Sequence, residues 1–438
     1  MSPTHLPIRS ALAAAACALL GSAAASGSAA EASSGQPTQV QSGILVYSES
    51  KRVTTVETVV NLSKELRAGR ILTGQVVFDA LTGASPNGAT PAGRVQTFTR
   101  PSGQGSYQVA AGQTPLDHTF QDTRFAGSIH YDVPLSAMSR VVYGAGLSLE
   151  RDYSSVGGDI LLSRDLFLRN TTVSLGLSGS LDRVSPLGGP PSALSVMSAP
   201  TSRHGDDEEE GEGGEGGGGK GKQVAGLRLG LTQVLTPSAL MQVNYSAGRT
   251  SGYLNDPYKI VSLVDGGPGP NQGEPVRYLY EKRPPSRLQQ SLYWLGKGTT
   301  GSDVVTLSYR YLWDDWGIRS HTLEARYRWQ AREQLSLEPI FRFYRQTAAS
   351  FYRHSLVDGE PLPGNVSADY RLGAMDAWTT GVKIGHPIAP GRELTLRLEY
   401  YLQKGNGKPD DAIGSQRNYD LFPDLRATIV QLGYSMGF

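Results

Sequence analysis

The sequence repeats one pattern along most of its length: segments of about 10–15 residues in which apolar and polar side chains alternate, separated by turn-forming residues. A period of two is the side-chain period of an extended strand, so each segment predicts a β-strand with one apolar and one polar face. In the segment 391–405, Leu394 and Leu396 alternate with Arg397 and Glu399. The pattern therefore predicts an all-β fold.

About sixteen such segments follow one another, and each except the first is long enough for the roughly 9–11 residues that a tilted membrane strand needs. They are residues 43–50, 53–66, 70–81, 120–135, 139–155, 159–170, 172–184, 223–236, 239–253, 287–299, 303–316, 318–331, 334–348, 374–388, 391–405 and 424–437. The first segment is weak, and a barrel of about fourteen strands is the alternative.

The connections between these segments differ in length in an ordered way. The long ones are 82–119, 185–222, 254–286, 349–373 and 406–423, whereas others, such as Arg67–Gly69 and Thr300–Ser302, hold only a few residues. If both chain ends are periplasmic, every long connection falls on the opposite side. This asymmetry predicts a transmembrane antiparallel β-barrel with short periplasmic turns and long extracellular loops.

Charged side chains on the predicted strands share the face opposite the apolar one. A charge at the bilayer midplane of a lipid-facing surface costs roughly 2–4 kcal/mol, so these residues are expected to face a polar lumen. A soluble lipocalin-type barrel would invert the two faces, but it needs only about eight strands and about half this length. The predicted lumen-lining residues are Arg310, Glu324, Arg326, Arg328, Glu338, Arg342, Arg397 and Glu399. Their mixed signs argue against a strongly selective pore.

Aromatic residues gather at one end of a predicted strand. Tyr309, Tyr311, Trp313 and Trp316 lie close together, and Tyr400 and Tyr401 are placed similarly on another strand. Aromatic rings are favoured at the boundary between membrane and water, so this clustering predicts an aromatic girdle.

The last stretch, Asp424–Phe438 (DLRATIVQLGYSMGF), ends the chain on an aromatic residue after regular alternation. It resembles the closing strand of bacterial outer-membrane barrels, which implies that Tyr434, Met436 and Phe438 form the recognition signal for the barrel assembly machinery. An edge strand of a soluble sandwich is the alternative.

The N-terminus predicts a secretory signal peptide at residues 1–30, with Arg9 before the apolar core Ala11–Leu20. Cys17, the only cysteine, lies in this core and is lost with it, unless it is the acylated residue of a lipoprotein. We expect a periplasmic lead-in at 31–42 and a barrel from 43 to 438, in the outer membrane of a Gram-negative bacterium. Removing Arg9 leaves 40 basic against 40 acidic residues, so nucleic acid is not an expected partner.

Residues 44–91 contain three short elements: Tyr47-Ser48-Glu49, Arg52-Val53 and the motif Asp79–Pro86. With these elements the segment resembles an uncharacterised proteobacterial family, domain of unknown function family 3570. The resemblance implies an outer-membrane barrel, and it hints at a periplasmic redox partner. It carries over no catalytic residue.

The motif Asp79–Pro86 (DALTGASP) opens the first long connection. Gly83 permits a positive φ and Pro86 fixes an extended path, while Asp79, Thr82 and Ser85 are expected to bind backbone amides of a loop folded over the lumen. A Ca²⁺ site that uses Asp79 is the alternative, although Ca²⁺ needs about six to eight oxygens and few are visible here.

Residues 203–222 form a Gly-rich acidic stretch that begins Arg203-His204 and contains Asp206 to Glu210. Glycine and like charges cannot bury a core, so we expect a disordered extracellular loop. A weak collector of cations at the pore mouth is the functional alternative.

Enzyme signatures are missing from the sequence. It has no G-x-S-x-G element, and the histidines are not spaced as metal ligands. We therefore expect a channel or transporter for small solutes or ions, with no enzymatic activity, cofactor or metal, and with membrane lipid and the assembly machinery as partners. The alternatives are a structural barrel that holds a periplasmic or surface partner, with redox activity as one option, and a hydrolase whose active site is assembled across strands.

Overall fold

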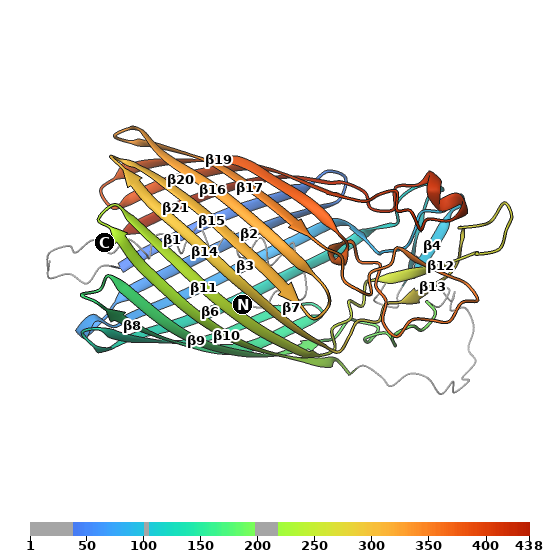
Figure 1. The fold of residues 1–438 in the computed structure, drawn as a ribbon, viewed down its shortest axis with the longest axis horizontal. Coiled ribbons are helices and arrows are strands. Elements are labelled where there is room, and N and C mark those ends of the chain that lie inside the picture. Colours follow the sequence, from blue (N-terminus) through green and yellow to red (C-terminus); the bar gives the residue numbers. More distant parts are fainter. Residues whose placement is uncertain (1–37, 100–104, 198–217) are drawn as a thin grey trace.

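The computed structural model describes residues 38–99, 105–197 and 218–438, which form a closed antiparallel barrel of sixteen strands and a set of loops at one of its ends (Figure 1). The first eight barrel strands are β1 (Thr38–Glu49), β2 (Val53–Glu65), β3 (Ile71–Pro86), β6 (Leu116–Ser136), β7 (Ser139–Glu150), β8 (Tyr153–Leu166), β9 (Thr171–Val184) and β10 (Lys220–Thr236). The other eight are β11 (Ala239–Gly252), β14 (Ser286–Thr300), β15 (Asp303–Asp314), β16 (Arg319–Arg332), β17 (Leu335–Gln346), β19 (Met375–Ala389), β20 (Arg392–Gly405) and β21 (Leu425–Gly437).

The last strand closes the barrel against the first. β21 pairs with β1 from Gln39 opposite Gly437 to Glu49 opposite Ala427. Thr38 and Phe438 exchange two backbone hydrogen bonds beyond this ladder, of 2.7 and 2.9 Å. Closure leaves no unpaired strand edge, which is what a sheet needs in a medium without water.

The predicted barrel of sixteen strands is confirmed, and the alternative of fourteen is wrong. The weak first segment is a full strand that begins at Thr38, so residues 38–42 of the expected lead-in belong to β1. The backbone groups of these residues pair with β2 and β21. The segment was predicted from side-chain alternation, which does not reveal backbone pairing, so its predicted start was too late. Lys220–Lys222, expected in the disordered loop, likewise begin β10. The predicted signal peptide (1–30) and residues 203–217 lie outside the described residues.

The outward faces of the strands are apolar and open to the surroundings. Val156, Leu177 and Ile129 are 60%, 58% and 52% exposed, and similar residues occur on strands all around the barrel. A protein in water would bury so large an apolar surface, so this band faces lipid. No helix among the described residues is long and apolar enough to cross a membrane.

All five long connections lie at one end of the barrel, and we call their described residues the cap. The cap consists of 87–115, 185–219, 253–285, 347–374 and 406–424, apart from the residues outside the described ranges. It contains a sheet of β12 (Ile260–Val264), β13 (Pro275–Tyr280) and β18 (Ser355–Val357), and a hairpin of β4 (Gln96–Thr99) and β5 (Ser106–Val109). Short 3₁₀ turns η2 (Tyr370–Leu372) and η3 (Gly414–Asn418) also lie in it, whereas η1 (Arg67–Gly69) is a turn at the opposite end.

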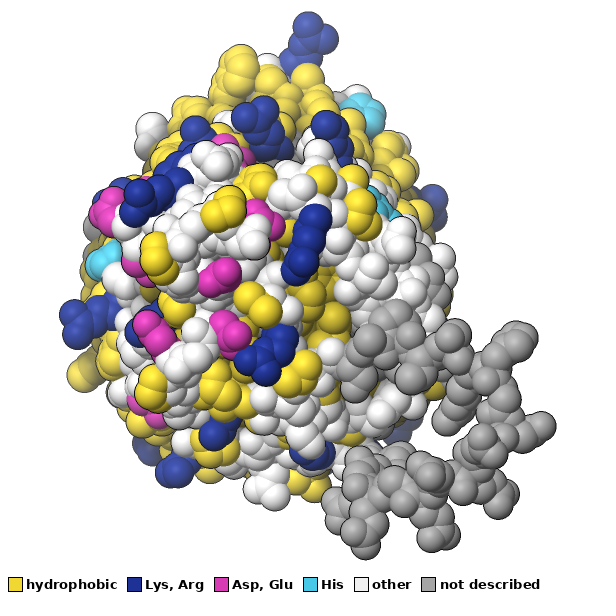
Figure 2. Space-filling view, turned by 90° about the vertical axis from the view of Figure 1, so that its right-hand side faces the viewer, with side chains coloured by type: hydrophobic (Ala, Val, Ile, Leu, Met, Phe, Trp, Pro, Cys, Tyr) yellow, Lys and Arg dark blue, Asp and Glu magenta, His cyan; other side chains and the backbone are white. Residues whose placement is uncertain are grey.

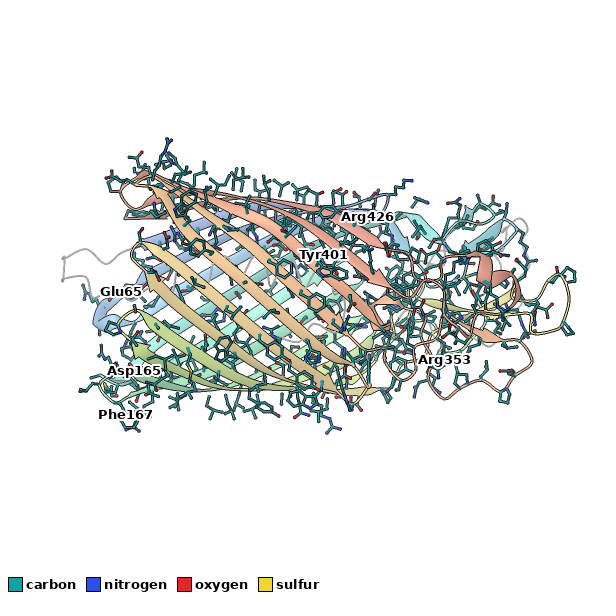
Figure 3. All side chains as sticks on the ribbon, turned by 45° about the horizontal axis from the view of Figure 1, so that its top comes forward. Glu65, Asp165, Phe167, Arg353, Tyr401 and Arg426 are labelled. Atoms are coloured by element: carbon teal, nitrogen blue, oxygen red, sulfur yellow. The ribbon has the colours of Figure 1, made fainter. Side chains whose placement is uncertain are left out.

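Figure 3 shows the same division between the two ends. Glu65, Asp165 and Phe167 lie at the end with short turns, whereas Arg353 lies in the cap. The predicted long-loop and short-turn sides are therefore confirmed.

The aromatic cluster divides between three environments. Tyr309, Tyr311 and Trp313 lie on the outward face of β15, and the Tyr311 and Trp313 rings stack at 5.4 Å. Trp316, in the turn after β15, is instead buried against the cap, where it packs edge-on against Phe351 at 5.1 Å. Tyr401 faces the lumen. Its neighbour Tyr400 points to the other face of β20, because successive residues on a strand point to opposite faces. The girdle prediction was thus wrong for Trp316 and Tyr401.

Candidate functional site

The inward faces of the barrel strands and two loops of the cap enclose a cavity of roughly 690 Å³. The barrel strands β14 to β17, β19 to β21 and β1 supply one side of it. Residues 255–259 and 368–371, from two different cap loops, form its roof. In Figure 2 the loops cover most of this end of the barrel, and side chains of both charges are mixed over it.

The structure places six of the eight predicted lumen-lining residues in the wall of this cavity. They are Arg310, Glu324, Arg326, Arg342, Arg397 and Glu399. Arg328 and Glu338 lie closer to the short-turn ends of β16 and β17, and they do not line the cavity. We call the inward faces of β15, β16, β17, β19 and β20 the arginine wall.

Two of the arginines on this wall are paired with a glutamate on their own strand. Arg326 Nε lies 2.8 Å from Glu324 Oε1, and Arg397 Nε donates to Glu399 Oε1 at 2.7 Å. Each pair joins residues two positions apart, whose side chains point to the same face of the strand. Arg328 makes a longer ion pair of 3.7 Å with Glu393, outside the cavity.

The other two arginines have no carboxylate partner within ion-pair distance among the described residues. Arg310 instead lies over the ring of Tyr293, with its guanidinium carbon 5.2 Å from the ring centroid. Arg342 lies opposite Glu324 in the pairing of β16 and β17, but that glutamate is bound to Arg326. Within the cavity the wall therefore presents two arginine charges that have no carboxylate partner among the described residues.

Acidic groups line the facing side of the cavity. Asp122, Glu150 and Asp152 come from β6, the end of β7 and the turn after it, and oxygens of all three lie within 4.8 Å of one another. Strands β6 to β8 lie across the sixteen-stranded ring from β16 to β19. Asp152 also accepts a hydrogen bond from the Tyr258 hydroxyl of the cap. The cavity thus has carboxylates on one side and arginines on the other.

The roof is held by a buried group of charges, which we call the roof network: Asp256, Lys259, Glu281, Arg283, Asp369 and Arg371. Arg371 bridges Asp256 and Asp369 at 2.5 Å each, and Arg283 donates to Asp369 at 2.8 Å and to Glu281 at 3.1 Å. Because Asp256 and Glu281 belong to one long loop and Asp369 to another, these bonds join the two loops.

Burial and charge act in opposition on the pKa values of the roof network. Burial alone would raise the pKa of Asp369, but Arg371, Lys259 and Arg283 hold it well below its ordinary range. Burial dominates for Glu281 and raises its pKa to about 7, even though Arg283 acts in the other direction. Burial likewise lowers the pKa of Lys259. Asp369 is therefore ionised at neutral pH, whereas Glu281 titrates there.

The motif Asp79–Pro86 lies within strand β3, so it does not open the first long connection as we expected. Gly83 has the predicted positive φ, +131°, and a β-carbon at this position would lie 2.4 Å from the Arg52 carbonyl oxygen. Thr82 is exposed, and Ser85 pairs with Asp117 across a bulge in the β3–β6 ladder. Pro86 ends the strand, and its carbonyl accepts a hydrogen bond from Lys259 of the roof network.

Asp79 has a role that differs from the expected one. Its carboxylate faces inward and pairs with Arg124 Nε at 2.5 Å, and the same arginine reaches Glu57 at 3.5 Å. Arg124 of β6 therefore ties β3 and β2 to its own strand through Asp79 and Glu57. Asp79 does not bind amides of a loop, because the strand continues past it to Pro86. Among the described residues, one group of three carboxylates lies close enough to hold a metal ion, and it consists of Asp122, Glu150 and Asp152. Asp79 is not part of this group, so the structure shows no carboxylate cluster for the Ca²⁺ alternative at Asp79.

The three residues of the predicted assembly signal lie at the closing seam. Tyr434 and Met436 pair with Ser42 and Val40 of β1, and Phe438 is 69% exposed at the end of the chain. Their role in assembly stays a prediction.

Sequence reasoning missed an apolar patch inside the lumen. Leu45, Tyr47, Leu425 and Ala427 pack together, with Tyr401 and Ile429 against them, and all but Ala427 line the cavity. The signal was present in β21, where Leu425, Ala427 and Ile429 are in phase with the inward-facing Gln431. The roof network had no such signal, because its members are far apart in the sequence.

Comparison with known proteins agrees with the resemblance noted in the sequence. The family described as "protein of unknown function (DUF3570)" matches residues 9–436. The chain belongs to this family. No curated protein matches the sequence of this DUF3570 member.

Solved structures similar to this DUF3570 protein are distant in sequence. The outer membrane protein OpdK of Pseudomonas aeruginosa has 8% identity and a TM-score of 0.41, with 92% of this chain and 99% of OpdK covered. OccK3 (OpdO) of the same organism has 9% identity and a TM-score of 0.40, over 92% and 96% of the two chains. The siderophore receptor PirA of Acinetobacter baumannii has 10% identity and a TM-score of 0.39, over 86% of this chain and 54% of PirA.

Proposed function

We propose that this protein is a channel of the Gram-negative outer membrane that passes small charged solutes or ions through its lumen. The observation that carries the proposal is the cavity of roughly 690 Å³ inside the lipid-facing barrel, with the arginine wall on one side and carboxylates on the other. Side chains of both signs along a pore attract ions and set which of them pass.

The shape of the lumen supports the same proposal. The inward faces of β9 and β10 carry small residues, among them Ser174, Gly176, Ser178, Gly226 and Gly230. Small side chains project little from the wall and leave space for water and solute. In this reading the cap faces the outside of the cell, and its roof network regulates access to the cavity.

The proposed location includes removal of the predicted signal peptide and recognition of the C-terminal strand by the assembly machinery. Truncating the side chain of the last residue, Phe438→Ala, is then expected to lower the amount of folded barrel in the outer membrane. Heat-modifiable gel mobility of the membrane fraction measures this amount.

A second function is favoured by the cap. Its own sheet, its hairpin and the roof network form an ordered surface over the mouth of the barrel, as a structural barrel that holds a surface or periplasmic partner requires. A redox-active partner is one version of this alternative.

Single-channel recording in a planar bilayer separates the two functions. We expect the refolded protein to give discrete conductance steps in potassium chloride, with a reversal potential that depends on the charges of the arginine wall. No conductance from protein whose heat-modifiable mobility shows folding would overturn the channel. Crosslinking and co-purification from outer membranes would then test for the partner.

A further inference from the structure

The arginine wall carries more positive charge than its glutamates neutralise. Four arginines on this wall line the cavity, Arg310, Arg326, Arg342 and Arg397, against two glutamates, Glu324 and Glu399. Since Arg326 and Arg397 bind those glutamates, Arg310 and Arg342 remain. Among the residues that the structure describes, neither has a carboxylate within 4 Å. Keeping two such charges in a partly enclosed cavity is costly unless a ligand or water compensates them.

Both arginines are placed so that a solute in the cavity can reach them. Arg310 is opposite Thr322, and Arg342 is opposite Glu324, which is two residues further along the same strand, β16. The two arginines therefore flank β16 at adjacent positions on the same inward face. The ring of Tyr293 supports one face of the Arg310 guanidinium. This stacking leaves the N–H groups at the edge of the guanidinium free to donate to a ligand.

The apolar patch of the lumen begins next to Arg342. In the strand pairing, Arg342 is followed by Thr379 of β19 and then by Tyr401 of β20. Tyr401 and Ile429 are partly exposed, line the same cavity and pack against the buried cluster that contains Leu45 and Leu425. A solute that reaches Arg342 with one end can therefore lay an apolar body on Tyr401 and Ile429.

We infer that the cavity binds a small organic carboxylate with an apolar body, held at its carboxylate by Arg310 and Arg342. The planar fork of arginine donates two parallel hydrogen bonds to a carboxylate, and such charge-assisted bonds are the strongest kind available here. A volume of roughly 690 Å³ fits a ligand of this class, as pockets for small molecules measure about 300–1,000 Å³.

The opposite wall of the cavity does not compete for the anion. Asp122, Glu150 and Asp152 offer carboxylate oxygens there, which accept hydrogen bonds and do not donate them, so a carboxylate finds its donors at the arginines. The inference deepens the proposed channel by naming its substrate class. The binding site itself does not require that the barrel conducts.

Equilibrium dialysis of radiolabelled benzoate against the full-length protein in detergent tests the site without any measurement of transport. We expect saturable binding by the unchanged protein, and Arg310→Gln or Arg342→Gln is expected to weaken it roughly tenfold or more, as for loss of a charged hydrogen bond. The double variant is expected to lose measurable binding. Arg342→Lys keeps the charge without the fork and is expected to bind with intermediate affinity.

Arg328→Gln is the matched control, because Arg328 faces the same lumen but does not line the cavity. It is expected to leave the affinity nearly unchanged. Unlabelled benzyl alcohol, which lacks the carboxylate, and inorganic phosphate, which lacks the apolar body, should compete poorly. Folding of each variant is checked by heat-modifiable mobility, and Arg342→Lys provides a readout if a Gln variant does not fold.

The possible results test the binding site, its substrate class and the channel separately. Absence of benzoate binding, equal binding by the double variant, or an equal loss in Arg328→Gln would overturn the site. Stronger competition by phosphate than by benzoate would overturn the substrate class. Binding without conductance in the planar bilayer would leave the site in place and remove the channel, whereas conductance without binding would do the reverse.

Discussion

Glu324 pairs with Arg326, two residues along its own strand, and not with Arg342, which lies directly opposite it on the neighbouring strand. The distance from Arg326 Nε to Glu324 Oε1 is 2.8 Å. This choice of partner leaves Arg342 available to solutes. Through its pair with Arg326, Glu324 also neutralises one of the positive charges of the arginine wall.

Removing the charge of Glu324 should therefore make the lumen more selective for anions. In Glu324→Gln both Arg326 and Arg342 lack a neutralising carboxylate, so the wall gains one net positive charge. The reversal potential in a potassium chloride gradient is expected to move toward the chloride equilibrium potential. Glu338→Gln, at an inward position that does not line the cavity, is the control. An equal shift in both variants would assign selectivity to the whole lumen and not to this wall.

Breaking the roof network should open the cap. Arg371→Gln removes the ion-pair partner of Asp256 and one of the two partners of Asp369, which keeps Arg283. Leaving the buried Asp256 carboxylate unpaired costs about 3 kcal/mol, the low end for buried pairs because 24% of the Arg371 side chain is exposed. We expect faster hydrogen exchange in peptides from residues 255–283 and 355–372, together with longer open times in the bilayer.

The control for this variant is Arg277→Gln, which breaks an exposed pair with Asp358 within the same cap. Because its arginine side chain is 52% exposed, we expect little change in exchange or open time. If Arg371→Gln opens no more often than Arg277→Gln, the roof network does not regulate access.

The stability of the cap should fall as the pH rises through neutrality. Burial raises the pKa of Glu281 from an ordinary 4.5 to about 7. Between these values the folded cap holds a proton that the unfolded loop releases. The stabilisation is therefore complete below about pH 4.5 and is lost above about pH 7, by roughly 1–3 kcal/mol. Asp369, with its lowered pKa, acts oppositely, and its contribution is lost only in acid.

Hydrogen exchange of the cap peptides at pH 5.5 and pH 8, corrected for the intrinsic rates, measures this dependence. Glu281→Gln cannot ionise, so the difference between the two pH values is expected to shrink in this variant. An unchanged difference would show that another group controls the cap.

Replacing Gly83 should lower the stability of the barrel, although Gly83 lies within a strand. A β-carbon there would meet the Arg52 carbonyl oxygen at 2.4 Å, and φ is +131°. Gly83→Ala is expected to cost about 1–3 kcal/mol of unfolding free energy, measured by urea titration in lipid vesicles. Gly74→Ala on the same strand meets no atom within 4 Å and should change the free energy little. Equal effects would mean that the bulge at Gly83 relaxes.

The strands were predictable because membrane and lumen impose opposite demands on alternate residues. Charged residues such as Arg397 and Glu399 had to face inward, and the expected sixteen segments correspond to the sixteen barrel strands. The lengths of the connections indicated which end carries the cap. Boundaries were less predictable: β1 begins at Thr38 because backbone pairing with β21, which no local pattern records, extends it.

The sequence by itself determined the barrel and the strand face on which its charges lie, because period-two alternation is a local property that the bilayer enforces on every strand. Only the tertiary structure decided which charges meet. Glu324 binds Arg326 and not Arg342, and Arg283 reaches Asp369 across 86 positions of sequence. Such pairings depend on strand register and on the folding of loops, and therefore on distances in space that no local pattern encodes. They leave Arg310 and Arg342 facing the cavity.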